Sequence, residues 1–118
     1  MAKSNTKLNY MEEDDILSLS KGMKVKASIE IGDFIIDVDQ NGLISGIEIL
    51  NASENLHLPE NQLKELQKAS MHVAYKPNYV RINLILQFKQ TEKEVTIPLT
   101  VDLGHGSIKT ENSVFAAV

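Results

Sequence analysis

The sequence predicts an α+β domain in which an antiparallel sheet of about seven or eight strands carries one helix on a face. Three features predict this fold. Apolar and polar residues alternate along most of the chain, with the period of two that is typical of half-buried strands. Turn-forming residues separate the alternating runs, as in a meander of hairpins. Only the segment Pro59–Ala69 has its apolar residues at helical spacing.

Five candidate strands occupy the first half of the chain. An acidic turn separates the first two, and Gly32 with Asp33 marks a tight turn between the third and the fourth. Asn41 and Gly42 tolerate positive φ angles at low cost, so these residues predict a hairpin turn between the last two strands. The candidate strands are residues 8–10, 16–19, 25–31, 34–38 and 43–50.

The second half begins with a loop or a single helical turn over Asn51–Leu58, and the helix follows. Pro59 suits the first helical position, where its missing N–H is not needed. Glu60 in the first turn and Lys68 in the last turn both complement the helix macrodipole. Two leucines three residues apart supply the apolar stripe that would pack on the sheet. Further strands are expected at residues 71–74, 79–88 and 94–101, and the tail, residues 107–118, either adds an edge strand or frays.

Length and composition exclude several classes of protein. The 118 residues fit one domain with an aliphatic core, since 42% of them are hydrophobic but only 5% are aromatic. A net charge of −4 and a single arginine, Arg81, argue against nucleic-acid binding. No cysteine is present for disulfides, thiolate catalysis or thiolate metal sites. Because the first residues are polar and no apolar run is long enough to span a membrane, we expect a cytoplasmic protein without membrane contact.

The one motif-like segment is Asp37–Glu48. Its Asp-x-Asp-x-Asn-Gly start, with a glutamate six residues after the glycine, satisfies the pattern of an EF-hand calcium loop. The entering segment is β-branched, alternating and interrupted by Gly32, so it is poor helix material. We therefore predict the turn of a β-hairpin and leave a weak divalent-cation site open as an alternative. That site would use Asp37, Asp39, Asn41 and Glu48.

A run of four carboxylates, Glu12–Asp15, follows the first strand. It could attract a cation or a basic partner. Four carboxylates that repel one another on a turn make a poor preorganised site, however. We therefore predict a solvated hairpin turn.

The three histidines, His57, His72 and His105, match no zinc motif. Asp102 and His105 could approach each other in a turn, but no nucleophile motif accompanies them. Surface or turn positions are the better interpretation of all three. The sequence therefore predicts no catalytic, cofactor-binding or metal-ligating residue, and no cofactor.

Four segments of the first half follow one another in a recognisable order, namely Tyr10 with its acidic turn, Ile16–Leu19, Phe34–Gly42 and Gly46–Ser53. In this order the chain resembles a widespread prokaryotic family of short domains of unknown function, and the resemblance covers about residues 7–58. These shared features are a turn, a glycine and strands, so the resemblance implies a β framework and no reaction. Residues 59–118, with the helix and the later strands, lie outside the resemblance.

Three functional hypotheses follow. The first is a non-enzymatic interaction or structural module that contacts a protein partner, or a second copy in a homodimer, through a sheet edge or face. The second is a small antitoxin-like regulatory partner of a basic protein, suggested by the net negative charge and the acidic turn. The third is the weak cation site at the hairpin. An enzyme of unrecognised type is the less favoured class, because no catalytic constellation is visible.

Overall fold

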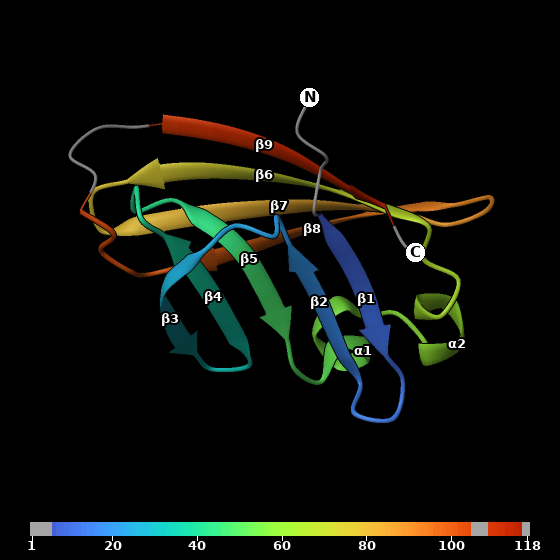
Figure 1. The fold of residues 1–118 in the computed structure, drawn as a ribbon. Coiled ribbons are helices and arrows are strands. Elements are labelled where there is room, and N and C mark those ends of the chain that lie inside the picture. Colours follow the sequence, from blue (N-terminus) through green and yellow to red (C-terminus); the bar gives the residue numbers. More distant parts are fainter. Residues whose placement is uncertain (1–5, 105–108, 117–118) are drawn as a thin grey trace.

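The computed structural model describes residues 6–104 and 109–116, and in these residues the chain forms two antiparallel sheets and two short helices (Figure 1). The first sheet is built by the first half of the chain and the second sheet by the second half. The helices connect the two. The elements are β1 (Lys7–Met11), β2 (Ile16–Ser20), β3 (Val25–Ile31), β4 (Phe34–Asp39), β5 (Ile44–Ile49), α1 (Ala52–Leu56), α2 (Glu60–Leu63), β6 (Lys68–Lys76), β7 (Tyr79–Gln87), β8 (Glu92–Leu99) and β9 (Lys109–Ala116).

The five-stranded sheet has the order β1-β2-β5-β4-β3, with every neighbouring pair antiparallel. Three of its connections are the hairpins predicted from the sequence, namely β1–β2, β3–β4 and β4–β5. β4 lies between β3 and β5, in agreement with its apolar character on both faces. Bulges interrupt the β3–β4 pairing at residues 25–27 and the β4–β5 pairing near Ser45.

The four-stranded sheet has the order β8-β7-β6-β9. β6 and β7 form a long hairpin in which the inward side chains of both strands are buried at every second position. β9 pairs with β6 along its length. The tail therefore adds an edge strand, which was one of the two alternatives predicted from the sequence. The first residues of the predicted tail strand, 107 and 108, and its last two, 117 and 118, lie outside the described residues.

One hydrophobic core joins the two sheets. Figure 1 shows the four-stranded sheet running across the five-stranded one, with strands in clearly different directions and the helices at one end. The core is aliphatic, as the composition predicts, with Tyr75 and Phe115 as its largest fully buried side chains. The inward faces contribute leucine, isoleucine and valine from both halves, including Leu17, Ile36, Ile47, Val73, Ile82 and Leu84.

The prediction of a single sheet is wrong, because the strands form two separate sheets. The sequence carries alternation in both halves but nothing that assigns a strand to one sheet or the other. The separation occurs at residues 50–67, where α1 and α2 lead the chain from β5 to β6. Both inward faces then bury their apolar residues against each other, which a single sheet with one helix could not do.

The predicted helix over Pro59–Ala69 is also wrong in length. α2 ends at Leu63, and the single turn anticipated over Asn51–Leu58 is present as α1. Strand pairing takes over at the C-terminal side, because the N–H of Gln67 already bonds to the carbonyl of Gln87 in β7. Lys68, placed by the sequence in the last helical turn, is instead the first residue of β6.

Gly46, on β5, stands where no side chain fits. A Cβ atom there would lie 2.8 Å from the carbonyl oxygen of Leu19 and 3.3 Å from the Asp37 Oδ2 atom. Because the closest contact is backbone of the paired strand, Gly46→Ala should destabilise the protein by about 1–3 kcal/mol in urea denaturation. Ser18→Ala, on the same sheet, adds no atom and should stay within about 0.5 kcal/mol of the wild type. Equal stability of both variants would contradict the close packing at Gly46.

Candidate functional site

The motif-like segment Asp37–Glu48 folds as the predicted hairpin, with β4 entering and β5 leaving the turn. Asp39 is only 3% exposed. Its Oδ1 atom accepts hydrogen bonds from the backbone N–H groups of Asn41, at 2.8 Å, and Leu43, at 3.1 Å. The carboxylate therefore holds the turn in shape, and its nearest donors are those of its own loop.

The other residues of the alternative cation site have separate partners. Asp37 accepts a hydrogen bond from the Ser28 hydroxyl on β3 at 2.7 Å. Glu48 lies on β5 between Ser18 and Ile35 of the neighbouring strands. Within residues 6–104 and 109–116, no three His, Asp or Glu side chains come together in a way that could hold a metal ion. The calcium-loop pattern is thus explained by turn and strand chemistry.

The histidines are dispersed. His57 ends α1 with a positive φ of 55°. His72 lies on β6, where its Nδ1 atom is 2.6 Å from the Asn112 side-chain oxygen on β9. His105 lies outside the described residues, so its approach to Asp102 stays a prediction.

The acidic turn contains a residue that the sequence did not single out. Glu12, Glu13 and Asp14 are exposed, as predicted for a solvated turn, but Asp15 is not. Its Oδ1 atom accepts a hydrogen bond of 2.6 Å from the Tyr10 hydroxyl. The Ser53 hydroxyl donates to its Oδ2 atom at 2.7 Å, and the Ser53 N–H lies 3.1 Å from Oδ1.

This Asp15 network replaces a local helix cap. α1 has no side-chain cap from Asn51, the residue at its N-cap position. Asp15 instead reaches the first turn of α1 from the β1–β2 turn, and its carbonyl also accepts the N–H of Ala52 at 2.9 Å. A carboxylate is favoured there because helix N-termini present free N–H groups. The network therefore fastens the first hairpin to the helix that follows the sheet.

Electrostatics mark the network as structural. Partial burial alone would raise the pKa of Asp15, but the hydrogen bonds from Tyr10 and Ser53 outweigh it and hold this pKa below its ordinary value. Burial, followed by the hydrogen bond to Asp15, raises the pKa of Tyr10. A carboxylate with a lowered pKa is a weak general base at neutral pH, and a tyrosine with a raised pKa keeps its proton. The Ser53 hydroxyl is therefore not activated as a nucleophile by this arrangement.

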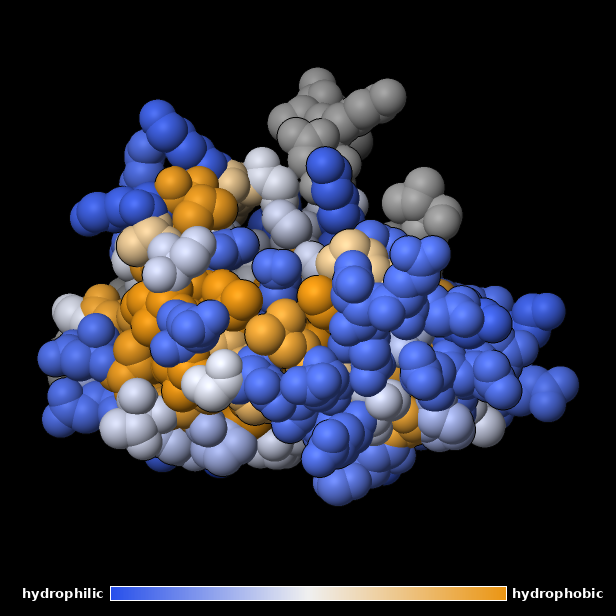
Figure 2. All heavy atoms as spheres, turned by 90° about the horizontal axis from the view of Figure 1, so that it is seen from below, coloured by the Kyte–Doolittle hydropathy of each residue, from blue (hydrophilic) through white to orange (hydrophobic). Residues whose placement is uncertain are grey.

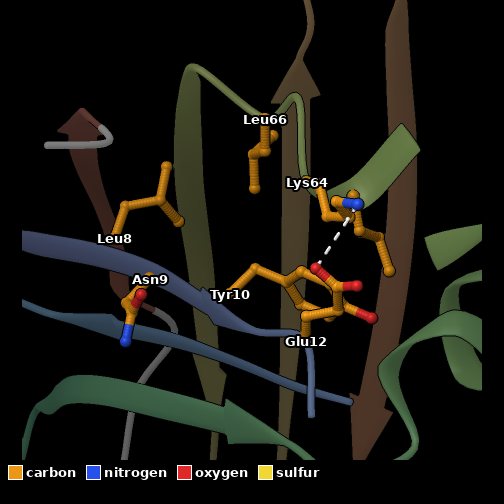
Figure 3. Close-up of a pocket in the computed structure, with 7 residues that line it drawn as sticks. Leu8, Asn9, Tyr10, Glu12, Lys64 and Leu66 are labelled. Carbon is orange, nitrogen blue, oxygen red and sulfur yellow. Dashed lines mark ion pairs between the residues drawn. The ribbon is translucent and has the colours of Figure 1, made fainter. Parts of the chain in front are cut away.

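A groove of about 370 Å³ lies beside the network, between β1 and the segment that joins α2 to β6 (Figure 3). Leu8 and Leu66 project into it from opposite sides. At its polar end, Lys64 forms an exposed ion pair of 3.4 Å with Glu12. Asn9, Tyr10 and Leu63 complete the lining.

Comparison of the sequence with known proteins identifies a matching family. Residues 7–53 match the family described as "Protein of unknown function (DUF2283)". An uncharacterized protein of Methanocaldococcus jannaschii is 33% identical over 91 residues, which cover 75% of this chain and 78% of that protein. The chain belongs to the DUF2283 family. The resemblance seen in the sequence is thereby confirmed.

A second relative, from Methanosarcina mazei, is 25% identical over 91 residues, covering 76% of this chain and 74% of that protein. Its name provisionally assigns it as a hypoxanthine phosphoribosyltransferase. No solved structure matches the chain significantly. No helix in the described part of the chain is long and apolar enough to cross a membrane.

The DUF2283 match coincides with a structural unit. Residues 7–53 contain all five strands of the first sheet and end in the first turn of α1. Tyr10, Asp15 and Ser53, at the two ends of this unit, meet in the Asp15 network. The second sheet lies beyond the matched residues, so in this chain the DUF2283 unit is completed by four further strands.

Proposed function

We propose that this DUF2283 protein is a non-enzymatic interaction module that self-associates through the exposed end of its first sheet. The observation that carries the proposal is the burial of β3. Among the strands in the described residues, β3 alone has no buried side chain, although it follows the same alternation as its neighbours.

The exposed end of the sheet is apolar. Ile29 pairs with buried Ile36 and Ala27 with buried Val38, so these residues of β3 share the face that forms the core further along the sheet. The core continues into this face but is not covered there. We call the following residues the β3 surface: Ala27, Ile29, Ile31 and Phe34, together with the exposed Met23 and Val25 beyond the bulge at residues 25–27.

Exposure on the β3 surface is large for such side chains. Met23 is 47% and Val25 43% exposed, while Ile29, Ile31 and Phe34 are half-buried at the margin of the core. Figure 2, seen from below, has hydrophobic side chains gathered on the side where β3 and β4 lie in Figure 1. Contiguous apolar surface of this kind is typical of contact sites, because covering it removes apolar area from water.

We propose that a second copy of this chain covers the β3 surface. Closed symmetric dimers use the same patch on both subunits, which an apolar, weakly charged surface permits. Contact through the face is favoured over pairing along the open edge of β3. That edge carries Lys24, Lys26 and a bulge, all of which are features that weaken indiscriminate strand pairing.

Catalysis is not supported by the described residues. The Ser53 hydroxyl donates to Asp15, whose lowered pKa makes it a weak base, and the groove beside β1 contains no pair of groups set for acid–base work. A phosphoribosyltransferase, as the Methanosarcina relative is provisionally named, must hold a diphosphate group. The helices here have only five and four residues, and no glycine-rich loop leads into either of them. We therefore do not extend that activity to this chain.

Val25→Glu should weaken self-association strongly. Sedimentation velocity over a range of concentrations should show the wild type passing from monomer to dimer. A buried carboxylate at the contact should shift this transition to at least about tenfold higher concentration. Val114→Glu is the matched control, because Val114 on β9 is 54% exposed but lies on the other sheet. A wild type that stays monomeric, or two variants with the same effect, would refute the proposal.

A further inference from the structure

A second surface lies at the opposite edge of the five-stranded sheet, along β1. Among the described residues, β1 pairs with β2 alone in that sheet, so no other strand of the sheet occupies its second backbone edge, although β1 also approaches β9 of the second sheet. Strand edges of this kind accept an extended segment as an additional strand. β1 has neither a proline nor a bulge in its pairing with β2.

Two adjoining hollows run along β1. The first is the groove floored by Leu8, Leu63 and Leu66 (Figure 3). The second lies over the acidic turn and is lined by residues 9–14. They share Asn9, Tyr10 and Glu12, so together they form one continuous track from an apolar floor to an acidic end.

The track is acidic overall. Glu12, Glu13 and Asp14 are exposed at its end, and Lys64 is the one basic side chain among the described residues that line either hollow. Glu60 acts electrostatically on the Tyr10 phenol as well, which places a further carboxylate near the same residues. Asp15 is engaged with Tyr10 and Ser53, and Glu12 pairs with Lys64, so Glu13 and Asp14 are the acids of the turn that remain for an external cation.

We propose that this track binds an extended, cationic segment of another protein. The segment lies along β1, inserts an apolar side chain between Leu8 and Leu66, and places a lysine or arginine at Glu13 and Asp14. A five-residue strand spans roughly 17 Å, which is enough for an apolar residue and a basic residue two or more positions apart. Backbone pairing supplies part of the affinity, and the two hollows supply the specificity.

Charge argues against the other occupants. A second copy of this chain, with its net charge of −4, would bring further carboxylates to an acidic rim. Nucleic acid and anionic membrane surfaces are repelled for the same reason. The β1 track and the β3 surface lie at opposite edges of the sheet, so this inference does not depend on self-association.

The probe is a short capped peptide in which leucine alternates with lysine, titrated into the isotopically labelled full-length chain while amide resonances are followed. We expect shifts confined to β1, the acidic turn and residues 63–66. The matched peptide with glutamate in place of lysine should not bind. The peptide with serine in place of leucine should bind at least about fivefold more weakly, because it leaves the apolar groove empty.

Variants of the chain locate the contact. Glu13→Lys combined with Asp14→Lys should weaken binding of the leucine–lysine peptide by at least about fivefold. Glu94→Lys, an exposed acid on the β8 edge, should leave it unchanged. The proposal would be overturned if the shifts spread over every acidic surface or if no shifts appeared at millimolar peptide. It would also be overturned if the two sets of lysine substitutions had equal effects, or if the serine peptide bound as well as the leucine peptide.

Discussion

Asp15→Ala should lower the free energy of unfolding by about 3 kcal/mol, a large part of the stability of a small domain. The variant removes one acceptor that serves three donors. The Tyr10 hydroxyl, the Ser53 hydroxyl and the Ser53 N–H all lose their partner. Hydrogen bonds to a charged group are worth roughly 1.5–3 kcal/mol, and half-buried donors without a partner add a desolvation cost.

Backbone conformation adds to the effect at Asp15. Its φ angle is +53°, in the left-handed region, which aspartate and asparagine tolerate better than alanine. Asp15→Asn keeps this tolerance and most of the shape but loses the charge. It should therefore be destabilised less than Asp15→Ala. Urea denaturation of the two variants beside the wild type separates the backbone contribution from that of the charge.

The Asp15 effect should depend on pH in a defined direction. The pKa of this carboxyl is held below its ordinary value of 3.8 in the folded protein. The folded state therefore binds its proton less readily than the unfolded state does. The stabilisation is fully present above the ordinary value and is lost as pH falls through the lowered one. The stability difference between wild type and Asp15→Asn should shrink when denaturation is repeated below about pH 4.

A neighbouring carboxylate provides the control. Asp14 is exposed and makes no hydrogen bond to α1 in the described structure. Asp14→Ala should therefore change stability by no more than about 0.5 kcal/mol and should show no comparable loss at low pH. If Asp14→Ala and Asp15→Ala behaved alike, the Asp15 network would not be the fastening of hairpin to helix that the geometry indicates.

Local patterns in the sequence predicted the hairpins well, because alternation and turn chemistry act between residues close in the chain. Asn41 and Gly42 specify the β4–β5 turn through backbone preferences alone. The division into two sheets depends on how inward faces such as those of Ile36 and Ile82 meet across the core. No pattern among residues close in the chain predicts how these two faces pack against each other. The short α2 shows the same limit, since strand pairing from Gln67 onward overrides a helix-compatible stretch.

The Asp15 network could not be found from spacing either. Asp15 and Ser53 are 38 positions apart, and Asp15 belongs to a run of four acids that looks uniformly solvated. The available signal was the resemblance, which included Tyr10, the acidic turn and Ser53 without saying that they touch. The matched segment ends at Ser53, where the network closes, so all three residues of the network lie within it.

Tyr75→Phe should cost about 2 kcal/mol, although it removes a single oxygen atom. Tyr75 lies on β6 and is fully buried between the sheets. Its hydroxyl accepts the backbone N–H of Ile44, on β5 of the other sheet, at 2.8 Å and lies 3.3 Å from the Glu111 carboxylate on β9. Without the hydroxyl, a buried N–H next to the β5 bulge loses its acceptor.

An ion pair next to the Tyr75 hydroxyl strengthens the same contact between the two sheets. Lys21, which follows β2, forms an ion pair of 2.9 Å with Glu111, so the Tyr75 hydroxyl belongs to a chain of polar contacts that connects the two sheets. Burial raises the pKa of Tyr75, with Glu111 adding to the effect, so the phenol stays protonated and can donate. Phenylalanine would leave the Ile44 N–H without its acceptor, and Glu111 would keep Lys21 but lose the phenol.

Tyr79→Phe is the matched control for Tyr75→Phe. Tyr79 begins β7 at the end of the same hairpin, and its ring lies 5.8 Å from the Lys76 ammonium, a contact that phenylalanine keeps. Thermal and urea unfolding should show a loss for Tyr75→Phe and almost none for Tyr79→Phe. Hydrogen exchange should also become faster at the Ile44 amide, because that group is released. Unchanged exchange there, with unchanged stability, would mean that the sheets are joined by apolar packing alone.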